Sequence, residues 1–255
     1  MSKLKVRNLT LGQGQPKVCV SLIASNFKEL FAEATRLNRL DCDIIEWRAD
    51  YFMYVNDMTF MRKAAYFIRY AIEDKPLIFT FRSHEEGGGQ IIDDDYYLEL
   101  NRLMIQTGLV DVIDIELDKV TKETKELITY AQMNNVRVLL SNHKFDTTPN
   151  KQSIKEMVNE MALSGADICK LAVTPSDLTD VLTILTASNE LQIEQPSLNF
   201  ILIGMGNTGK LTRMTGELFG SVITYAANGK VSSAPGQLSI TEVKAAMDLI
   251  GDDEN

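Results

Sequence analysis

Cysteine and histidine are scarce in this sequence of 255 residues, which has three cysteines and two histidines. Cys19, Cys42 and Cys169 are odd in number and lack the short spacing of metal ligands. This usage is typical of a reduced, intracellular protein, and we expect it in the cytoplasm. Because catalytic zinc sites commonly use two or three histidines, the two in this chain argue against a zinc enzyme. We predict no metal site.

Long apolar runs and an excess of positive charge are also missing. No segment approaches the roughly 18 consecutive apolar residues of a membrane span, and residues 1–17 have no apolar run suited to a signal peptide. The formal net charge of -9 argues against a general nucleic-acid binder, since such proteins need a basic face. An anionic small substrate remains compatible, because a few arginines can focus positive potential inside a cleft.

One pattern repeats along the whole chain: a short apolar or alternating run is followed by a longer stretch with helical periodicity. The strand candidates are residues 17–25, 43–50, 76–83, 109–117, 136–143, 166–173, 198–205 and 221–227. Residues 240–252 supply the last helix. Asn26 and Ser176 are predicted N-caps, and Gly108 and Gly165 follow helical stretches, where a left-handed residue often ends a helix.

Alternating strands and helices predict parallel pairing with right-handed crossovers. Eight even units in about 250 residues favour one closed (β/α)8 TIM barrel over residues 1–255. An open, doubly wound sheet is the alternative. Residues 5–17 predict a short N-terminal β-hairpin that caps the amino end of the barrel.

Polar residues gather near the carboxyl ends of the predicted strands, where the chemistry of such barrels takes place. They are Glu46, Arg48, Thr80, Arg82, Glu86, Asp114, Glu116, Ser141, His143, Lys170 and, further along, Arg213. Pairs that lie two residues apart on a strand share one face. Carboxylates and arginines at such positions can also form a structural ion network, and a lone histidine there is often a structural hydrogen-bonding residue.

Lys170 is the most informative of these residues. It lies in an apolar strand between Cys169 and Leu171, and lysine is almost never fully buried without a partner or a function. Desolvation favours the neutral amine, which is the nucleophile that forms a Schiff base with a carbonyl substrate. The alternative is a structural lysine paired with Glu46 or Glu116.

Residues 204–211 contain a glycine-rich string that matches G-x-G-x-x-G and nearly matches a P-loop. The P-loop interpretation fails because Leu211 replaces the hydroxyl residue that binds magnesium. The dinucleotide interpretation fails because the string follows the seventh of eight strands, and no acidic residue ends the next strand. A glycine turn there can still help to bind an anionic group. The acidic run 93–95 is typical of a helix N-terminus.

Several short strings, spread in order over almost the whole chain, together resemble the type I 3-dehydroquinate dehydratase family. They are Glu46-Trp47-Arg48-Ala49-Asp50, Thr80-Phe81-Arg82, Glu86-Gly87-Gly88, Ser141-Asn142-His143, Asp167-Ile168-Cys169-Lys170-Leu171-Ala172-Val173, Met205-Gly206, Phe219-Gly220-Ser221 and Ser233-Ala234-Pro235-Gly236-Gln237. Each string is weak alone, whereas the set is specific. The family is a usually homodimeric barrel enzyme of the shikimate pathway that needs no cofactor and dehydrates 3-dehydroquinate to 3-dehydroshikimate.

The resemblance implies a role for each matching residue. Lys170 would form the imine with the substrate ketone, His143 would be the general base and acid, and Glu86 would assist His143. Arg213 would pair with the substrate carboxylate. The other residues implied to bind substrate are Glu46, Arg48, Arg82, Met205, Ser233 and Gln237. The serine role is carried to Ser233 rather than Ser232, since Ser233 directly precedes Ala234.

This residue set suits the dehydration. A protonated imine is an electron sink, so the carbanion formed next to it is held as an enamine. One histidine can remove the proton and then protonate the departing hydroxyl, because its pKa is ordinarily near 6.5. Two rival interpretations remain: a class I aldolase, which shares the barrel and the lysine imine, and a non-catalytic barrel that binds a carboxylate.

Overall fold

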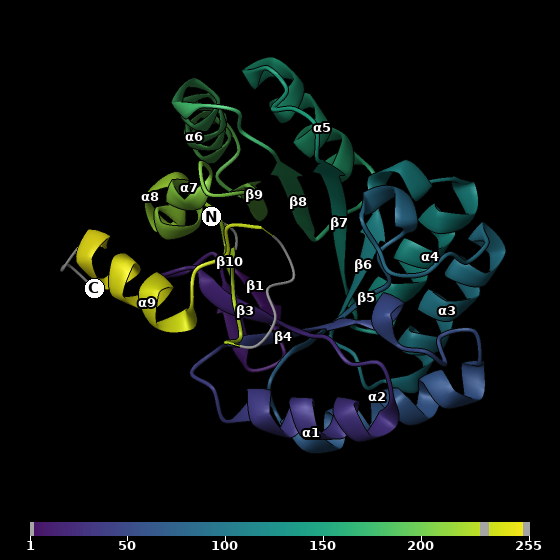
Figure 1. The fold of residues 1–255 in the computed structure, drawn as a ribbon. Helices are drawn as coiled ribbons and strands as arrows, with labels where there is room; N and C mark the ends of the chain where they lie inside the picture. Colours follow the sequence, from purple (N-terminus) through teal and green to yellow (C-terminus); the bar gives the residue numbers. More distant parts are fainter. Residues whose placement is uncertain (1–2, 230–234, 252–255) are drawn as a thin grey trace.

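A parallel barrel forms the centre of the molecule (Figure 1). The computed structural model describes residues 3–229 and 235–251. Within them the strands pair in the order β10-β3-β4-β5-β6-β7-β8-β9. Their bounds are β3 (Lys17–Leu22), β4 (Ile44–Arg48), β5 (Leu77–Thr80), β6 (Val112–Glu116), β7 (Arg137–Lys144), β8 (Ile168–Val173), β9 (Phe200–Gly204) and β10 (Ile223–Ala226). A parallel bridge between Phe200 and Ser221 joins the two ends of the sheet. The predicted barrel is confirmed, and the open sheet is excluded.

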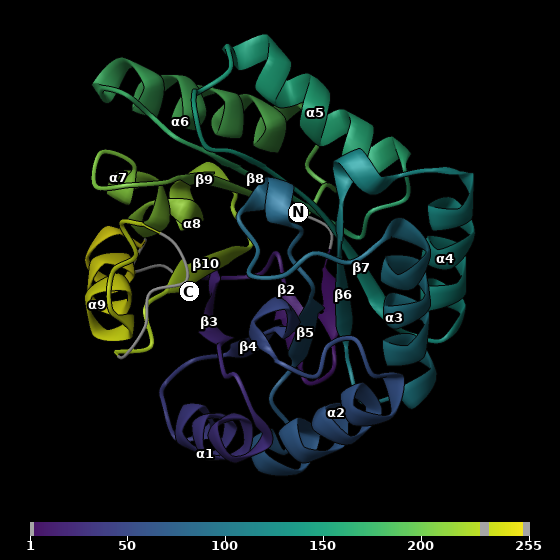
Figure 2. The ribbon, with the colours of Figure 1, turned by 45° about the vertical axis from the view of Figure 1, so that its right-hand side comes forward.

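Helices surround the strands (Figure 2). They are α1 (Phe27–Asn38), α2 (Met58–Ile72), α3 (Asp94–Thr107), α4 (Lys122–Met133), α5 (Lys151–Leu163), α6 (Leu178–Glu194), α7 (Lys210–Met214), α8 (Gly216–Phe219) and α9 (Ile240–Ile250). Short 3-10 helices follow three of the strands: η1 (Ala49–Tyr51), η2 (His84–Glu86) and η3 (Leu117–Lys119). Within the described ranges, none of the helices combines the length and the apolar character needed to cross a membrane.

The helix caps agree with the sequence in all but one case. Asn26 caps α1 and Asp93 caps α3, while Gly108 ends α3 in the left-handed conformation. The prediction that Ser176 caps α6 is wrong. Asp177 is the N-cap, because its carboxylate accepts from two backbone amides of the first turn, whereas the Ser176 hydroxyl donates to Asp180.

Alternation along the strands separates two apolar layers. Outward residues such as Trp47, Phe79 and Leu140 pack against the helices in the larger core. The first inward residues of five successive strands are apolar and pack inside the barrel: Ile44, Ile78, Val112, Leu139 and Ile168. The next inward residue of each of these strands is polar: Glu46, Thr80, Asp114, Ser141 and Lys170. The barrel therefore holds an apolar floor beneath a polar centre.

The predicted hairpin is present as β1 (Leu4–Val6) and β2 (Leu9–Leu11), which pair antiparallel. Val6 and Leu11 are buried against the inward apolar residues and close the amino end of the barrel. Arg7, at the turn, donates to Asp74 and Asp111 and fixes the hairpin to the barrel. The hairpin thus covers the apolar inward layer, and the polar inward residues, two positions further along each strand, lie toward the carboxyl end of the barrel.

We predict that Leu11→Ala lowers the free energy of unfolding by about 2–5 kcal/mol, because it leaves a cavity under the barrel. Leu11 is 1% exposed, whereas Leu163 is 89% exposed and provides the matched control. Leu163→Ala should change stability by less than about 0.5 kcal/mol. Urea denaturation of both variants measures the difference. Equal stabilities would show that the hairpin contributes little to the barrel.

Candidate active site

A cavity of about 210 Å³ opens at the carboxyl end of the barrel. Nine of the ten residues proposed from the sequence line it: Glu46, Arg48, Arg82, Glu86, His143, Lys170, Met205, Arg213 and Gln237. Ser233, the tenth, lies outside the described residues. The barrel therefore brings together side chains that are separated by up to 191 positions in the sequence, from Glu46 to Gln237.

Lys170 projects from β8 into the centre of the barrel and is 5% exposed. Its Nζ lies 3.4 Å from Glu46 Oε1 and 3.8 Å from Asp114 Oδ2. It also sits 4.2 Å from the centroid of the Tyr225 ring. The structural alternative of pairing with Glu46 is present, but Glu116 is not a partner. Glu116 instead accepts hydrogen bonds from Arg82 and from the backbone amide of Ser83.

His143 lies on β7, the strand next to Lys170, and its Nδ1 is 2.8 Å from Glu86 Oε2. Burial lowers the pKa of His143 well below its usual value, and the positive charges of Arg82, Lys170 and Arg48 lower it further. The imidazole is therefore neutral at physiological pH. A neutral imidazole can accept a proton, as a general base must.

Glu86 comes from η2 and reaches over the end of β7. Burial raises its pKa to about 8; Arg82 opposes this shift, whereas Glu116 and Asp114 add to it. Within the tightly coupled pair, we therefore assign a low proton affinity to His143 and a high one to Glu86. The surroundings of the two groups, rather than the ordinary pKa values of a carboxyl and an imidazole, therefore decide which of them binds a proton more tightly.

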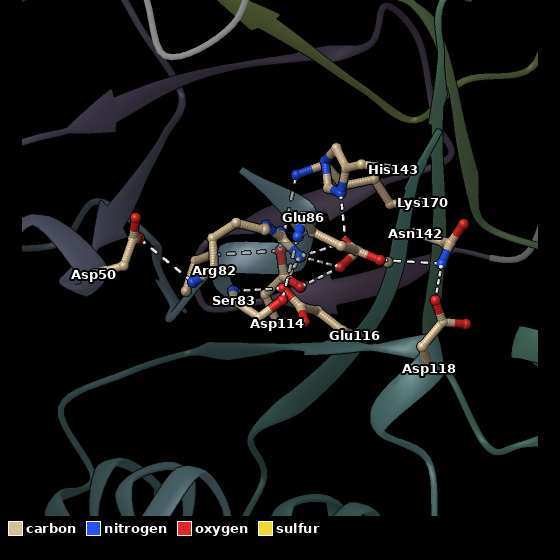
Figure 3. A network of polar contacts seen from close by, with 12 residues as sticks. Asp50, Arg82, Ser83, Glu86, Asp114, Glu116, Asp118, Asn142, His143 and Lys170 are labelled. Atoms are coloured by element: carbon tan, nitrogen blue, oxygen red, sulfur yellow. Dashed lines mark hydrogen bonds and ion pairs between the residues drawn. The ribbon is translucent and has the colours of Figure 1, made fainter. Parts of the chain in front are cut away.

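Arg82 is the hub of the ionic network at the base of the cavity (Figure 3). Its Nη1 donates to Glu86 at 3.2 Å, Glu116 at 3.1 Å and Ser141 at 2.8 Å, and its Nη2 donates to Asp114 at 2.6 Å. The carboxylates hold the pKa of Arg82 well above its usual value despite burial. The structural ion network that the sequence left open therefore exists, and Arg82 also lines the cavity.

Two further charged residues on β4 are held in place. Glu46 accepts a 2.7 Å hydrogen bond from the Ser21 hydroxyl. Burial opposes its ionisation, but Lys170, Arg48 and this hydroxyl outweigh burial and lower the pKa of Glu46 to about 2. Arg48 donates from Nε and Nη2 to the two oxygens of Asp50, each at 2.8 Å. Both side chains are thus charged and oriented before any ligand binds.

Arg213 differs from the other cations of the site. It lies on α7, is 2% exposed and, within the described residues, has no carboxylate partner. Its Nη1 donates to the Tyr225 carbonyl at 3.4 Å, while its buried Nε has no partner in the described part of the chain. Burial lowers the pKa of Arg213 to about 10, so it stays charged. A buried guanidinium without a counter-ion is suited to binding both oxygens of a carboxylate.

The glycine-rich turn after β9 has a packing role. A Cβ on Gly209 would lie 2.2 Å from the Gly204 carbonyl carbon, so the backbones touch where the chain enters α7. Neither glycine lines the cavity, and an anion-binding role for the turn therefore lacks support. The described residues also contain no group of three potential ligands placed to hold a metal ion.

Two aromatic residues that line the cavity were not predicted from the sequence. Tyr225 is the second inward residue of β10, after Ile223, so strand alternation alone could have identified it. Phe145 stacks on His143, with ring centroids 6.2 Å apart and an interplanar angle of 17°. Its position two residues after His143 gave no signal, since it lies beyond the regular strand.

Comparison with known proteins gives a consistent result over the whole barrel. Residues 18–254 match the family described as Type I 3-dehydroquinase. A 3-dehydroquinate dehydratase of Alkaliphilus oremlandii is 42% identical over 247 residues, which cover 97% of this chain and 96% of that protein. The crystal structure of a type I 3-dehydroquinate dehydratase from Clostridium difficile is 40% identical, with a TM-score of 0.93 and 97% coverage of both chains. The structure from Geobacillus kaustophilus is 32% identical, with a TM-score of 0.94 and coverage of 98% and 96%.

We predict that Arg82→Met lowers the free energy of unfolding by about 3–5 kcal/mol at neutral pH, because buried carboxylates lose their counter-charge. The loss should shrink as the pH falls and the carboxylates become protonated. Lys244→Met, which breaks a surface ion pair with Asp41, is the control and should cost less than about 1 kcal/mol. Urea denaturation at several pH values tests both. A fully stable Arg82→Met protein at neutral pH would contradict the assigned role.

Proposed function

The chain belongs to the type I 3-dehydroquinase family, and from that premise we propose that it dehydrates 3-dehydroquinate through an imine on Lys170. It is a hydro-lyase, since this family removes water from its substrate. The finer proposal is that Lys170 is the nucleophile and His143 the general base and acid. The product would be 3-dehydroshikimate, an intermediate of the shikimate pathway.

One observation carries the proposal: a buried lysine, a neutral histidine and an unpaired buried arginine line the same small cavity. A structural role for Lys170 needs only its carboxylate partners. It does not account for His143 beside it or for the charged Arg213 without a counter-ion. A substrate with both a ketone and a carboxylate makes use of all three groups.

The proposed reaction begins at Lys170. Once its ammonium has lost a proton, the amine attacks the substrate ketone, and loss of water gives a protonated imine. His143 Nε2 then removes a proton from the carbon next to the imine carbon, and the electron pair moves into the enamine. The enamine expels the hydroxyl on the following carbon, which takes the proton from His143 and leaves as water. Hydrolysis of the conjugated imine releases the enone and regenerates Lys170.

The other residues of the cavity would position the substrate. Arg213 would bind the carboxylate, because its guanidinium has no internal counter-ion among the described residues. We propose Glu46, Arg48, Arg82, Met205, Gln237 and Ser233 as the remaining substrate contacts. Arg82 would do so while its Nη atoms stay bonded to the network. The Clostridium difficile relative is described with covalent modified comenic acid, and a covalent modification is compatible with a reactive lysine.

The family also suggests the setting in which this chain works. We propose one catalytic domain over residues 1–255 that forms a homodimer in the cytoplasm, without a cofactor. Two rival functions would remain if the following experiments contradicted the proposal: a class I aldolase and a non-catalytic carboxylate-binding barrel.

We predict that Lys170→Ala abolishes turnover of 3-dehydroquinate, followed by the ultraviolet absorbance of the conjugated enone. Borohydride added with substrate should fix mass on Lys170 of the unaltered protein and none on the variant. Lys125→Ala, a substitution at an exposed position on α4, is the control and should retain both signals. Folded, unaltered protein that gives no absorbance change would favour the aldolase or the binding barrel. Turnover without any trapped adduct would exclude the imine mechanism but leave the dehydratase activity standing.

We predict that His143→Ala still forms the imine but eliminates water about 10²–10⁴-fold more slowly, because the general base is lost. Borohydride trapping measures the first step, and enone absorbance measures the second. Elimination at the normal rate would make His143 a structural residue. Loss of both signals would assign His143 to imine formation as well.

A further inference from the structure

The carboxylate of Glu86 is held from both sides of β7. His143 faces the cavity and lies 2.8 Å from Glu86 Oε2, while Asn142, the preceding residue, donates from Nδ2 to Glu86 Oε1 at 3.0 Å. Consecutive strand residues point to opposite faces, so these two bonds reach Glu86 from inside and outside the barrel wall. Figure 3 shows Glu86 between the two side chains. Asn142 itself does not line the cavity.

The orientation of the Asn142 amide is fixed by a second carboxylate. Its Nδ2 also donates to Asp118 Oδ2 at 3.2 Å, and the side chain is 1% exposed. Its Oδ1 has no hydrogen-bond partner among the described residues. Two carboxylates therefore accept from the amide nitrogen, and turning the amide around would direct its oxygen at both of them. Asp118 thus keeps the donor end of Asn142 on Glu86.

We propose that Asn142 is a positioning residue, which favours the ionised form of Glu86 and aligns it so that His143 carries its proton on Nδ1 and offers Nε2 to the substrate. The inference rests on the proposed function, in which His143 is the general base. Asn142 has no contact with the cavity and acts on the reaction only through Glu86.

The chemistry depends on which partner of the Glu86–His143 hydrogen bond is the donor. An ionised Glu86 accepts from Nδ1–H, and the lone pair of the imidazole is then on Nε2. A protonated Glu86 would donate to Nδ1, which moves the ring proton to Nε2 and blocks proton removal from the substrate. A hydrogen bond donated to a carboxylate favours its charged form. The Asn142 amide therefore favours the active tautomer.

The surroundings of Glu86 make such a donor useful. Burial and neighbouring carboxylates raise the pKa of Glu86, which favours the inactive, protonated form. The charged and titratable groups that face it are Arg82 from the segment after β5, Asp114 and Glu116 from β6, Asp118 from η3, and His143 from β7. Arg82 divides its donors among several acceptors, so a second donor on the other oxygen stabilises the ionised form.

The test is the pH dependence of kcat/KM in the full-length Asn142→Leu protein. Activity requires ionised Glu86, so it should rise with pH through the pKa of that group and be lost below it. Leucine has a similar size but donates no hydrogen bond, so the ionised form of Glu86 loses one donor and its pKa rises. The acidic limb, which is the low-pH side of the kcat/KM profile, should therefore move up by about one pH unit, as expected for one bond to a charged group. Below the limb, kcat/KM should fall roughly tenfold, with little change in KM and full borohydride trapping.

Asn199→Leu is the matched control. Asn199 is also a buried asparagine with an unpartnered Oδ1, but it lies just before β9 at the amino end of the barrel. Its variant can lose stability but should keep the original limb. A folded Asn142→Leu protein with an unmoved limb would overturn the positioning role. If the unaltered protein formed no enone from 3-dehydroquinate, the proposed function itself would be overturned.

Two further measurements cover a failure of Asn142→Leu to fold. Asn142→Ser is smaller and polar, and its hydroxyl is too short to replace the amide, so it should give the same shift in the limb. In the unaltered protein, the side-chain NH₂ resonances of Asn142 should titrate with Glu86 by NMR. Resonances that stay constant across that titration would overturn the proposal without any substitution.

Discussion

The interaction between Arg82 and its carboxylate partners is the constraint on which the rest of the site depends. Its guanidinium joins Asp114, Glu116 and Glu86, which come from β6 and η2, and it also bonds to Ser141 on β7. Charges this deeply buried are tolerated only when they are paired and hydrogen-bonded. Because one cation serves several carboxylates, it also fixes the relative positions of the strands that carry the reacting groups.

The same network separates the proton affinities of neighbouring groups. Glu46 faces Lys170 and Arg48, which lower its pKa to about 2, whereas burial among other carboxylates raises the pKa of Glu86 to about 8. His143 is surrounded by cations and stays neutral. Three titratable side chains thus take different roles through their environments. Among the cations that line the cavity, Arg213 has no carboxylate partner within the described residues, and an anionic ligand would supply the missing charge.

Strand alternation explains why so much of the site could be predicted. A side chain two positions after an inward apolar residue is also inward, so the strand pattern alone places Glu46 and Lys170 inside the barrel. The choice between Glu116 and Asp114 as a partner of Lys170 could not be made in this way. Both residues are inward on β6, and their partners depend on where the Arg82 guanidinium and the Ser83 amide lie. The Asn142 contact was missed for a related reason, since an outward residue on β7 meets a carboxylate from another loop.

The sequence by itself determined the eight-unit rhythm, the inward direction of the polar residues and the unusual placement of Lys170, because these follow from local periodicity and burial. Only the tertiary structure decided which charges of the cavity neutralise one another and that Arg213, among its cations, has no carboxylate partner within the described chain. The physical reason is that Coulomb energies depend on distances of a few ångströms between strands far apart in sequence. Those distances exist only after the barrel has closed.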